Sequence, residues 1–348
     1  MNEPRRSGEL RGGRPMGGPR PPRRRRGSGP ATLLFGILAI LFFFAVLYMI
    51  NKNLDSKSDS SSKQKTQMVA EDSDQIEQAD TEAVKALTGD GLTVTFLDVG
   101  QGNAILFACD GEYLLYDGGP DKTDSYVMEY LKEQEIGELT YVVSSHYDSD
   151  HVSGLIEVLQ ELTVDTILDA DYVHDSKTYE LFLEAVEENG GRELHPAVGD
   201  SYSLGQASFT VVCPDSYDHS DSNENSIGIR LVYGETSFLI CGDAPASMED
   251  WMIDSGENLE STVYVCSHHG SASSNSADFL MEVVPEYVVI SCGLDNSYGH
   301  PHEEVMELLE SMEIDLYRTD LQGTISVTSD GQNLTWNQAA CTDYSDGD

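Results

Sequence analysis

The densest group of reactive side chains in this sequence lies on one short turn. An apolar run at 140–144 is typical of a buried strand, and a helical pattern begins a few residues later. Between them come two histidines and two aspartates: His146, Asp148, Asp150 and His151. Such side chains repel one another unless something positive lies among them, and imidazole nitrogen with carboxylate oxygen suits Zn²⁺, Mn²⁺ or Fe²⁺. The sequence therefore predicts a metal site. A polar turn with Asp150 as a helix cap is the alternative.

Two other expected strands end in a single carboxylate. Asp117 follows the run Tyr113–Tyr116 and precedes two glycines, so it either braces the histidine turn or lies in a plain turn. Asp243 follows the buried run Thr236–Cys241, where an unpaired charge is costly. A cation resolves that cost, and a cap on the helix expected at 246–254 is the alternative.

The remaining candidate ligands are histidines. The run Thr262–Cys266 ends just before His268 and His269. Because successive side chains of an extended chain face opposite ways, we expect one metal ligand here. His268 is favoured as that ligand, with His269 as a substrate or oxyanion contact, although the reverse order stays open. His300 follows a later strand. We expect it to act as a proton donor or phosphate contact, and a helix-cap or core role is the alternative. The histidines in polar loops receive no role: His174, His195 and His219.

These side chains need a scaffold that brings strand ends together. Besides the strands named above, β-rich runs predict strands at Thr93–Leu97, Ala104–Cys109, Phe209–Cys213, Gly228–Tyr233, Tyr287–Ser291 and Thr324–Thr328. Apolar residues at three and four spacing predict helices at 123–134, 152–161, 177–188, 246–254, 275–283 and 302–312. Early strands cluster in hairpins, and a further hairpin turns at Gly234 and Glu235, whereas later strands alternate with helices. This order predicts an α/β fold of two sheets with helices outside.

The N-terminal quarter differs in composition from the rest. Residues 1–30 hold nine arginines and two acidic side chains, and residues 31–50 carry no charge. An uncharged helix of that length spans about 30 Å, the thickness of a bilayer core, and no small-x-small site of a cleaved signal peptide follows it. We expect a cytoplasmic tail at 1–30, a transmembrane signal-anchor at 31–50 and a polar, disordered linker at 51–90. The positive-inside rule then places a single domain, 91–348, outside the cell membrane.

Composition and charge exclude several classes of protein. A hydrophobic content of 39% with ordinary glycine and proline does not fit a collagen-like, coiled-coil or wholly disordered chain. The net charge is −41, and residues 91–348 alone hold 50 acidic and six basic side chains. Nucleic-acid binders gain affinity from Lys and Arg. This domain is therefore expected to repel a long polyanion beyond its metal centre.

The turn and the other strand ends together resemble a known family. The run HYDSDH at 146–151 is similar to the His-x-His-x-Asp-His motif of the metallo-β-lactamase superfamily, with Asp148 in place of the second histidine. With FLDVGQGNA, LLYDGG, NENSIGIRL, FLICGD, CSHHGS and NSYGHPH in order, it resembles the extracellular domain of the ComEC/Rec2 competence proteins. The resemblance spans nearly all of 91–340 and implies an αββα sandwich of two mixed sheets.

The resemblance also implies two divalent metal ions, Zn or Mn. The implied ligands are His146 and Asp148 on one ion, Asp150, His151 and His268 on the other, and Asp243 as a bridge. Asp150 or His300 is then expected to carry protons to the leaving group. Asn225 and Ser226 lie where the wider superfamily has another histidine ligand. That ligand is thus missing or replaced at one metal position, and these two residues, like Asp117, are expected behind the ligands or beside the substrate.

We therefore expect a membrane-anchored, outward-facing, binuclear metallohydrolase. The resemblance implies phosphodiester hydrolysis, as a nuclease in competence and DNA uptake, and the acidic surface favours short oligonucleotides or small phosphodiesters. The alternatives are a hydrolase of a lactone, thioester or sulfate ester, and a non-catalytic binding module on the same fold. One span cannot pass DNA through a membrane, so a separate membrane channel is the expected partner.

Overall fold

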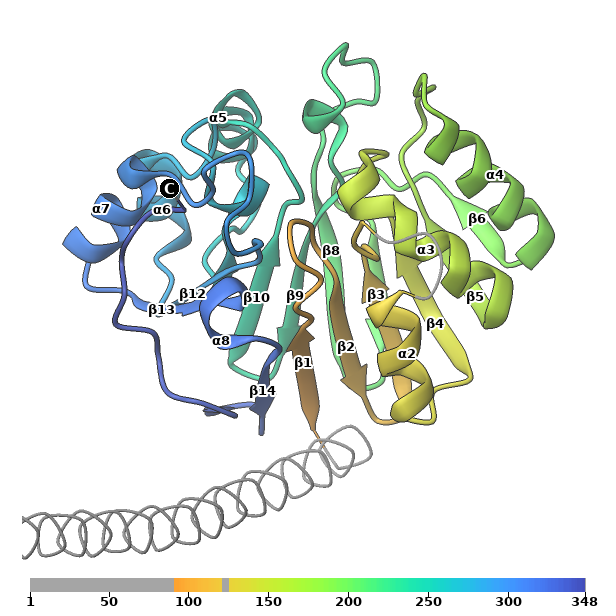
Figure 1. Ribbon diagram of the computed structural model, residues 1–348, viewed down its shortest axis with the longest axis horizontal. Helices are drawn as coiled ribbons and strands as arrows, with labels where there is room; N and C mark the ends of the chain where they lie inside the picture. The colour runs from red at the N-terminus through yellow and green to blue at the C-terminus, as the bar shows by residue number, and fades with distance from the viewer. Residues whose placement is uncertain (1–90, 121–124, 348) are drawn as a thin grey trace, which may run out of the picture. The chain divides into compact units, whose positions relative to one another are not determined.

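Two mixed β-sheets with helices on their outer faces make up residues 91–120 and 125–347, the parts of the chain that the computed structural model describes (Figure 1). This is the α/β arrangement that the order of strands and helices predicts. The expected tail, membrane anchor and linker at 1–90 lie outside the described residues. Within the described ranges, no helix has the length and apolar character needed to cross a bilayer.

The first sheet has eight strands in the order β15-β14-β1-β2-β3-β4-β5-β6. Their bounds are β1 Leu92–Phe96, β2 Ile105–Cys109, β3 Glu112–Tyr116, β4 Glu138–Val143, β5 Thr163–Leu168, β6 Arg192–Leu194, β14 Ile325–Ser329 and β15 Leu334–Trp336. Neighbours from β15 to β3 are antiparallel, and neighbours from β3 to β6 are parallel. The parallel half of this sheet therefore directs several strand ends to one edge.

The second sheet repeats this division with seven strands in the order β13-β12-β11-β10-β9-β8-β7. Their bounds are β7 Ser201–Leu204, β8 Ala207–Cys213, β9 Gly228–Tyr233, β10 Thr236–Ile240, β11 Val263–Val265, β12 Tyr287–Ile290 and β13 Asp315–Arg318. The neighbours from β10 to β13 are parallel, and those from β7 to β10 are antiparallel. The pairing of β9 with β10 confirms the hairpin expected at Gly234 and Glu235.

Helices cover the parallel halves of both sheets. Figure 1 shows helices beside β3 to β6 and others beside the β10 to β13 side. Their bounds are α2 Tyr126–Glu133, α3 Ser149–Glu161, α4 Lys177–Asn189, α5 Ala246–Ser255, α6 Ala277–Val283 and α7 Glu303–Ser311, followed by a short α8 at Thr319–Gln322. In α3 the buried Val152, Leu155, Ile156 and Leu159 form the stripe that packs on the sheet.

Two apolar cores hold these layers together. One fills the space between the two sheets and beneath α2 to α4, where Phe107 of β2 meets Phe238 of β10 edge-on at a centroid distance of 6.3 Å. The other lies between the second sheet and α5 to α7. Because the sheets are fixed by both cores, loops that follow the parallel strands have rigid bases.

Several strands in the structure had no counterpart in the sequence patterns. β5 has an alternating burial pattern with Asp165 exposed, and β13 contains the buried Arg318, so neither is an uninterrupted apolar run. Arg318 is accommodated because its guanidinium binds Asp320 at 2.7 Å. The missing strands lie away from the sheet centres, where tertiary neighbours rather than apolar runs decide the structure.

The first sheet is joined by strands far apart in the sequence. β1 pairs antiparallel with β14 from Leu92↔Ser329 to Phe96↔Ile325. On its other side β1 pairs with β2, so it is a central strand. The sheet is thus complete only when both ends of the domain are in place.

Candidate metal centre

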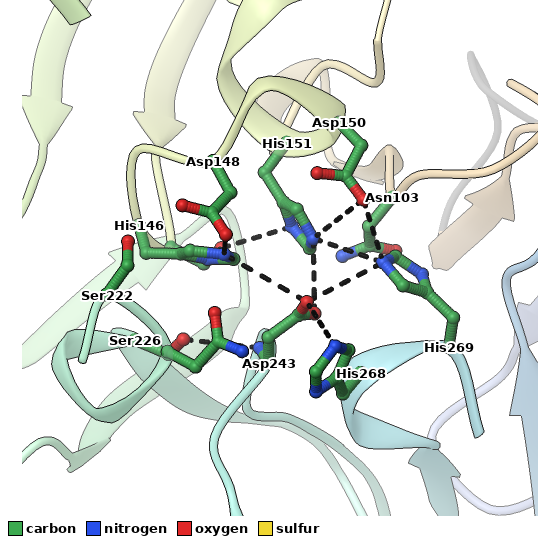
Figure 2. A network of polar contacts seen from close by, with 12 residues as sticks. Asn103, His146, Asp148, Asp150, His151, Ser222, Ser226, Asp243, His268 and His269 are labelled. Atoms are coloured by element: carbon green, nitrogen blue, oxygen red, sulfur yellow. Dashed lines mark hydrogen bonds and ion pairs between the residues drawn. The ribbon is translucent and has the colours of Figure 1, made fainter. Parts of the chain in front are cut away.

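The polar side chains named from the sequence meet where parallel strands end. Asp117 follows β3, the histidine turn follows β4, Asp243 follows β10, and His268 follows β11. Because the carboxyl ends of parallel strands lie on one edge of a sheet, such edges are common ligand sites. Figure 2 shows the labelled side chains that point toward one another: His146, Asp148, Asp150, His151, Asp243, His268 and His269.

The turn after β4 places four side chains around the start of α3. His146 and His151 are fully buried, whereas the side chains of Asp148 and Asp150 remain 39% and 28% exposed. The N-cap of α3 is Asp148, and its side chain makes no capping hydrogen bond. The alternative of Asp150 as the cap is therefore wrong. The carboxylate of Asp148 is free to face the centre, where its Oδ2 lies 3.8 Å from His146 Nε2.

Asp243 is the residue that contacts every histidine of the centre. Its Oδ1 lies 3.1 Å from His151 Nε2, and its Oδ2 lies 4.0 Å from His146 Nε2. The same Oδ2 is 3.7 Å from Nε2 of both His268 and His269 (Figure 2). The cap of α5 is Pro245, so the helix-cap alternative for Asp243 is wrong.

The expectation for His268 and His269 rested on an extended chain, and that premise is wrong. Both residues have left-handed backbone angles, with φ of 53° and 57°. The buried His269 directs Nε2 to within 3.3 Å of both Asp150 Oδ2 and His151 Nε2. The side chain of His268 stays 25% exposed, and it contacts Asp243 but not Asp150 or His151. His269 therefore occupies the position expected for His268. Gly270, which directly follows the two histidines, is the sequence feature that indicates a turn here.

The donor set fits divalent cations. Metal ligands at about 2.0–2.2 Å from a cation lie about 3–4 Å from one another, and the contacts among these residues fall in that range. Within the described residues, His146 Nε2 is buried and has no hydrogen-bond partner, which is costly unless a cation binds it. Two overlapping groups each offer three ligand atoms within 4.8 Å of one another: His146, His151 and Asp243, and Asp150, His151 and His269.

Asp117 fixes this centre from behind. Its fully buried carboxylate accepts hydrogen bonds from Ser145 N at 2.8 Å, Ser145 Oγ at 2.9 Å and Asn103 Nδ2 at 3.1 Å. It also lies 2.8 Å from His151 Nδ1. This contact leaves Nε2 of His151 directed at Asp243 and sets the orientation of the ring. The position behind the ligands agrees with the bracing role expected for Asp117.

The buried groups shift one another's pKa values. Burial, helped by His151, lowers the pKa of His146. Burial also lowers the pKa of His151, but the carboxylates of Asp243 and Asp117 outweigh it and hold that pKa well above its usual value. For Asp243 burial raises the pKa, and the imidazoles of His151 and His269 outweigh it and hold the pKa well below its usual range. Asp243 is therefore ionised at neutral pH, as a cation ligand must be.

Three further residues named from the sequence lie around the centre. His300 packs edge-on against His268, with a ring-centroid distance of 5.3 Å. Burial, together with the nearby His269, lowers the pKa of His300 to about 4. The cap of α7 is His302 rather than His300. Ser226 Oγ accepts a hydrogen bond from Asp243 N at 3.2 Å. Asn225 does not face the centre, because its side chain bonds backbone atoms of residues 219 and 221.

His174, to which the sequence assigns no role, reaches the outer rim of the centre. Its Nε2 lies 3.4 Å from Asp148 Oδ1, and its Nδ1 lies 2.9 Å from Ser176 Oγ. No local pattern marks His174. It meets Asp148 because β5 runs parallel beside β4, so the loops after both strands share one edge.

Asp169, at the end of β5, supports the histidine turn from the other side. Its buried carboxylate accepts a hydrogen bond from the Tyr147 hydroxyl at 3.2 Å and lies 3.0 Å from His195 Nδ1. With Glu193 these residues form a third group of closely spaced ligand atoms. Tyr147 belongs to the turn itself, so Asp169 helps to hold the turn in place.

Asp169 provides a pH-dependent contribution to stability. Burial is the main reason that its pKa is raised to about 7. An unfolded aspartate has a pKa of about 4, so its contribution is full below about pH 4 and is lost as the pH rises to about 7. The difference in free energy of unfolding between Asp169→Asn and the parent should therefore shift in favour of the variant as the pH rises from about 5 to about 8. A difference that stays constant over this range would contradict the raised pKa.

Comparison with known proteins agrees with this geometry. The sequence profile described as "Metallo-beta-lactamase superfamily" matches residues 97–293. ComE operon protein 3 of Bacillus subtilis (strain 168) is 27% identical over 254 residues, covering 67% of this chain and 32% of that protein. Competence protein ComA of Neisseria gonorrhoeae is 31% identical over 234 residues, covering 67% of this chain and 31% of that protein. The chain thus spans about a third of the length of these curated relatives.

Solved structures show a more distant likeness. Igni18, described as a novel metallo hydrolase from Ignicoccus hospitalis KIN4/I, is 16% identical with a TM-score of 0.45, covering 67% of this chain and 98% of that one. YhfI of Bacillus subtilis, described as a metallo-beta-lactamase fold protein, is 14% identical with a TM-score of 0.46, covering 66% of this chain and 98% of that one.

Proposed function

The chain belongs to the metallo-β-lactamase superfamily, whose members are generally metal-dependent hydrolases, and we propose that it is a phosphodiesterase acting on short single-stranded DNA. The observation that carries this proposal is the meeting of buried imidazoles and carboxylates around Asp243. Relatives named as competence proteins support a nucleic-acid substrate. The acidic surface supports a short one, because long strands gain affinity from basic residues that are scarce here.

The residues that would hold two divalent cations divide into two sets around a shared carboxylate. They are His146 and Asp148 for one cation, Asp150, His151 and His269 for the other, and Asp243 for both. When bound, such cations activate water and neutralise charge on a phosphoryl oxygen. His269 replaces His268 in this assignment because it lies beside Asp150 and His151.

The remaining polar side chains contact substrate or move protons. His268 stays on the open side of Asp243, and its Nδ1 lies 3.2 Å from Ser273 Oγ, which orients the ring. We assign it contact with a phosphoryl oxygen. Although burial raises the pKa of Asp150, the hydrogen bond from His269 and the charge of His151 hold it below its usual range. Asp150 is thus ionised at neutral pH, and we assign it the role of accepting a proton from water, whereas His300, with a pKa of about 4, is neutral at pH 7.

We further infer that residues 31–50 anchor the protein in the cell membrane with the catalytic domain outside. The support is the uncharged run at 31–50 and the nine arginines that precede it. In this placement the enzyme meets DNA outside the cell, and a separate membrane channel would be needed for uptake.

The proposal is tested with the purified full-length chain and Mn²⁺ or Zn²⁺. We expect hydrolysis of methyl p-nitrophenyl phosphate and of a short labelled DNA strand, and loss of both activities with a chelator. Asp150→Asn should lower kcat/KM about 10²-fold, because the proton acceptor and one ligand charge are lost. Intact cells that produce the protein should cleave the added DNA, which does not cross a membrane.

The matched control is Asp254→Asn, which removes an exposed carboxylate from α5 and should leave the rate unchanged. If the protein hydrolyses only lactones or thioesters, phosphodiesters are not its substrate class. Parent-level cleavage by Asp150→Asn would refute the assigned proton acceptor. Cleavage that begins only after cell lysis would contradict the outward orientation.

A further inference from the structure

The loop between β12 and α7 carries an exposed aromatic ring beside the metal centre. Within the described residues, the exposed side chains of the phenylalanine, tyrosine and tryptophan type are Tyr126 at 37% and Tyr298 at 64%. Leu294, on the same loop, is 66% exposed. Large apolar side chains exposed together often mark a binding surface. Nothing in the catalytic assignment above uses either residue.

The loop that carries Tyr298 is held in one conformation by Asn296. The side-chain oxygen of Asn296 accepts hydrogen bonds from the backbone N–H groups of Tyr298 and His300, each at 3.1 Å. Its amide nitrogen donates to Gly293 O at 2.9 Å and to His300 O at 2.5 Å. One half-buried side chain thus ties both ends of the loop, so the backbone that carries Tyr298 is already ordered before binding.

The ring of Tyr298 lies one side chain away from the residues around Asp243. It stacks on His300 with a centroid distance of 5.6 Å and an interplanar angle of 20°. His300 is in turn 5.3 Å from His268, whose Nε2 lies 3.7 Å from Asp243 Oδ2. Because one face of Tyr298 is covered by His300 and the side chain is still mostly exposed, the opposite face is open.

The charge distribution determines which part of a nucleotide can be held away from the cations. Most basic side chains of the described residues are already engaged by the protein itself: Lys132 with Glu161, Lys177 with Glu180, Arg230 with the backbone oxygen of Glu260, and Arg318 with Asp320. Residues 91–348 carry a net charge of −44. Flanking phosphates therefore find repulsion rather than cations. A base has a neutral π-face that an aromatic ring can hold regardless of this charge.

We propose that Tyr298 is the stacking platform for the nucleobase next to the scissile phosphodiester. The proposal rests on the proposed function and sets its substrate class: nucleotide phosphodiesters, preferred over simple dialkyl or alkyl aryl phosphates of the same charge. Stacking is tolerant of sequence, so no strong preference among the four bases is expected from this residue.

The test compares substrates with and without bases on the full-length, metal-loaded protein. Tyr298→Ala should lower kcat/KM for a short thymidine strand about five- to a hundredfold. It should leave the rate with an abasic strand of equal length and with methyl p-nitrophenyl phosphate unchanged. Tyr298→Phe should restore the thymidine rate, because stacking does not need the hydroxyl. Tyr126→Ala, at the other exposed tyrosine, is the matched control and should have no effect.

A binding measurement makes the outcome independent of turnover. A strand containing 2-aminopurine should lose fluorescence when it binds the protein with Ca²⁺ in place of Mn²⁺, and Tyr298→Ala should abolish that loss. An equal effect of Tyr298→Ala on base-containing and abasic strands, or unchanged quenching, would overturn the platform while the phosphodiesterase stands. If methyl p-nitrophenyl phosphate is also not hydrolysed, the proposed function fails, and quenching still decides the role of Tyr298.

Discussion

Asp243→Asn should remove cation binding at both positions of the centre and lower kcat/KM for phosphodiesters about 10³-fold or more. The side chain keeps its shape, but it loses a charge that lies within 4.0 Å of His146, His151, His268 and His269. A neutral amide also presents N–H donors where an imidazole nitrogen or a cation requires an acceptor. Metal content of the purified variant and its rate with methyl p-nitrophenyl phosphate measure the two effects.

The control must separate the effect of losing Asp243 from the general effect of losing a buried carboxylate. Glu249 of α5 is fully buried and binds the backbone N–H groups of Asn275 and Ser276 at 2.5 Å and 2.9 Å, away from the centre. Glu249→Gln should therefore lower stability and leave the metal content intact. Two tightly bound equivalents of metal in Asp243→Asn would rule out Asp243 as the shared ligand.

The second large effect is expected at Asp117, where stability and metal affinity depend on one carboxylate. Asp117→Asn directs an amide N–H₂ at groups that are themselves donors, namely Ser145, Asn103 and His151. Removing the anionic partner of a buried pair costs about 3–5 kcal/mol of unfolding free energy. Loss of the contact that orients a ligand histidine weakens metal binding about 10- to 100-fold. Denaturant unfolding without metal and metal titration of the folded protein measure the two effects separately.

The control for Asp117 shares its unusual backbone. Asp295 also has a left-handed conformation, with φ of 53° against 58° for Asp117, but its side chain is exposed. Asp295→Asn should change neither stability nor metal affinity by more than about 0.5 kcal/mol. If Asp117→Asn lowers stability and leaves metal affinity unaltered, Asp117 supports the fold alone and does not position His151.

The parts of the centre that could be predicted from sequence are those where ligand types follow an apolar strand directly. The turn at 146–151, Asp117 and Asp243 all have this form, and within each sheet parallel strands direct such ends to one edge. The preference for His268 over His269 depends on backbone angles, and its premise of an extended chain is wrong. Two successive left-handed residues are rare enough that an extended chain was the natural expectation.

The contacts that were missed depend on neighbours far away in the sequence. His174 meets Asp148 only through the alignment of β4 and β5, and β5 itself was not expected because its exposed Asp165 interrupts the apolar run. The family resemblance predicts Asn225 behind the ligands or beside the substrate, but its side chain closes its own loop. The membrane anchor and its orientation stay predictions, since residues 1–90 lie outside the described part of the chain.

The pairing of β1 with β14 has a consequence for biosynthesis. A ribosome releases Leu92–Phe96 long before Ile325–Ser329 exists, so for most of synthesis this apolar strand has an unpaired edge. Contacts between such distant segments form slowly, and an open edge invites pairing with other chains. We expect prematurely terminated chains that lack β14 to aggregate rather than to accumulate as soluble protein. Chaperones that bind this strand edge would then determine the yield of active enzyme.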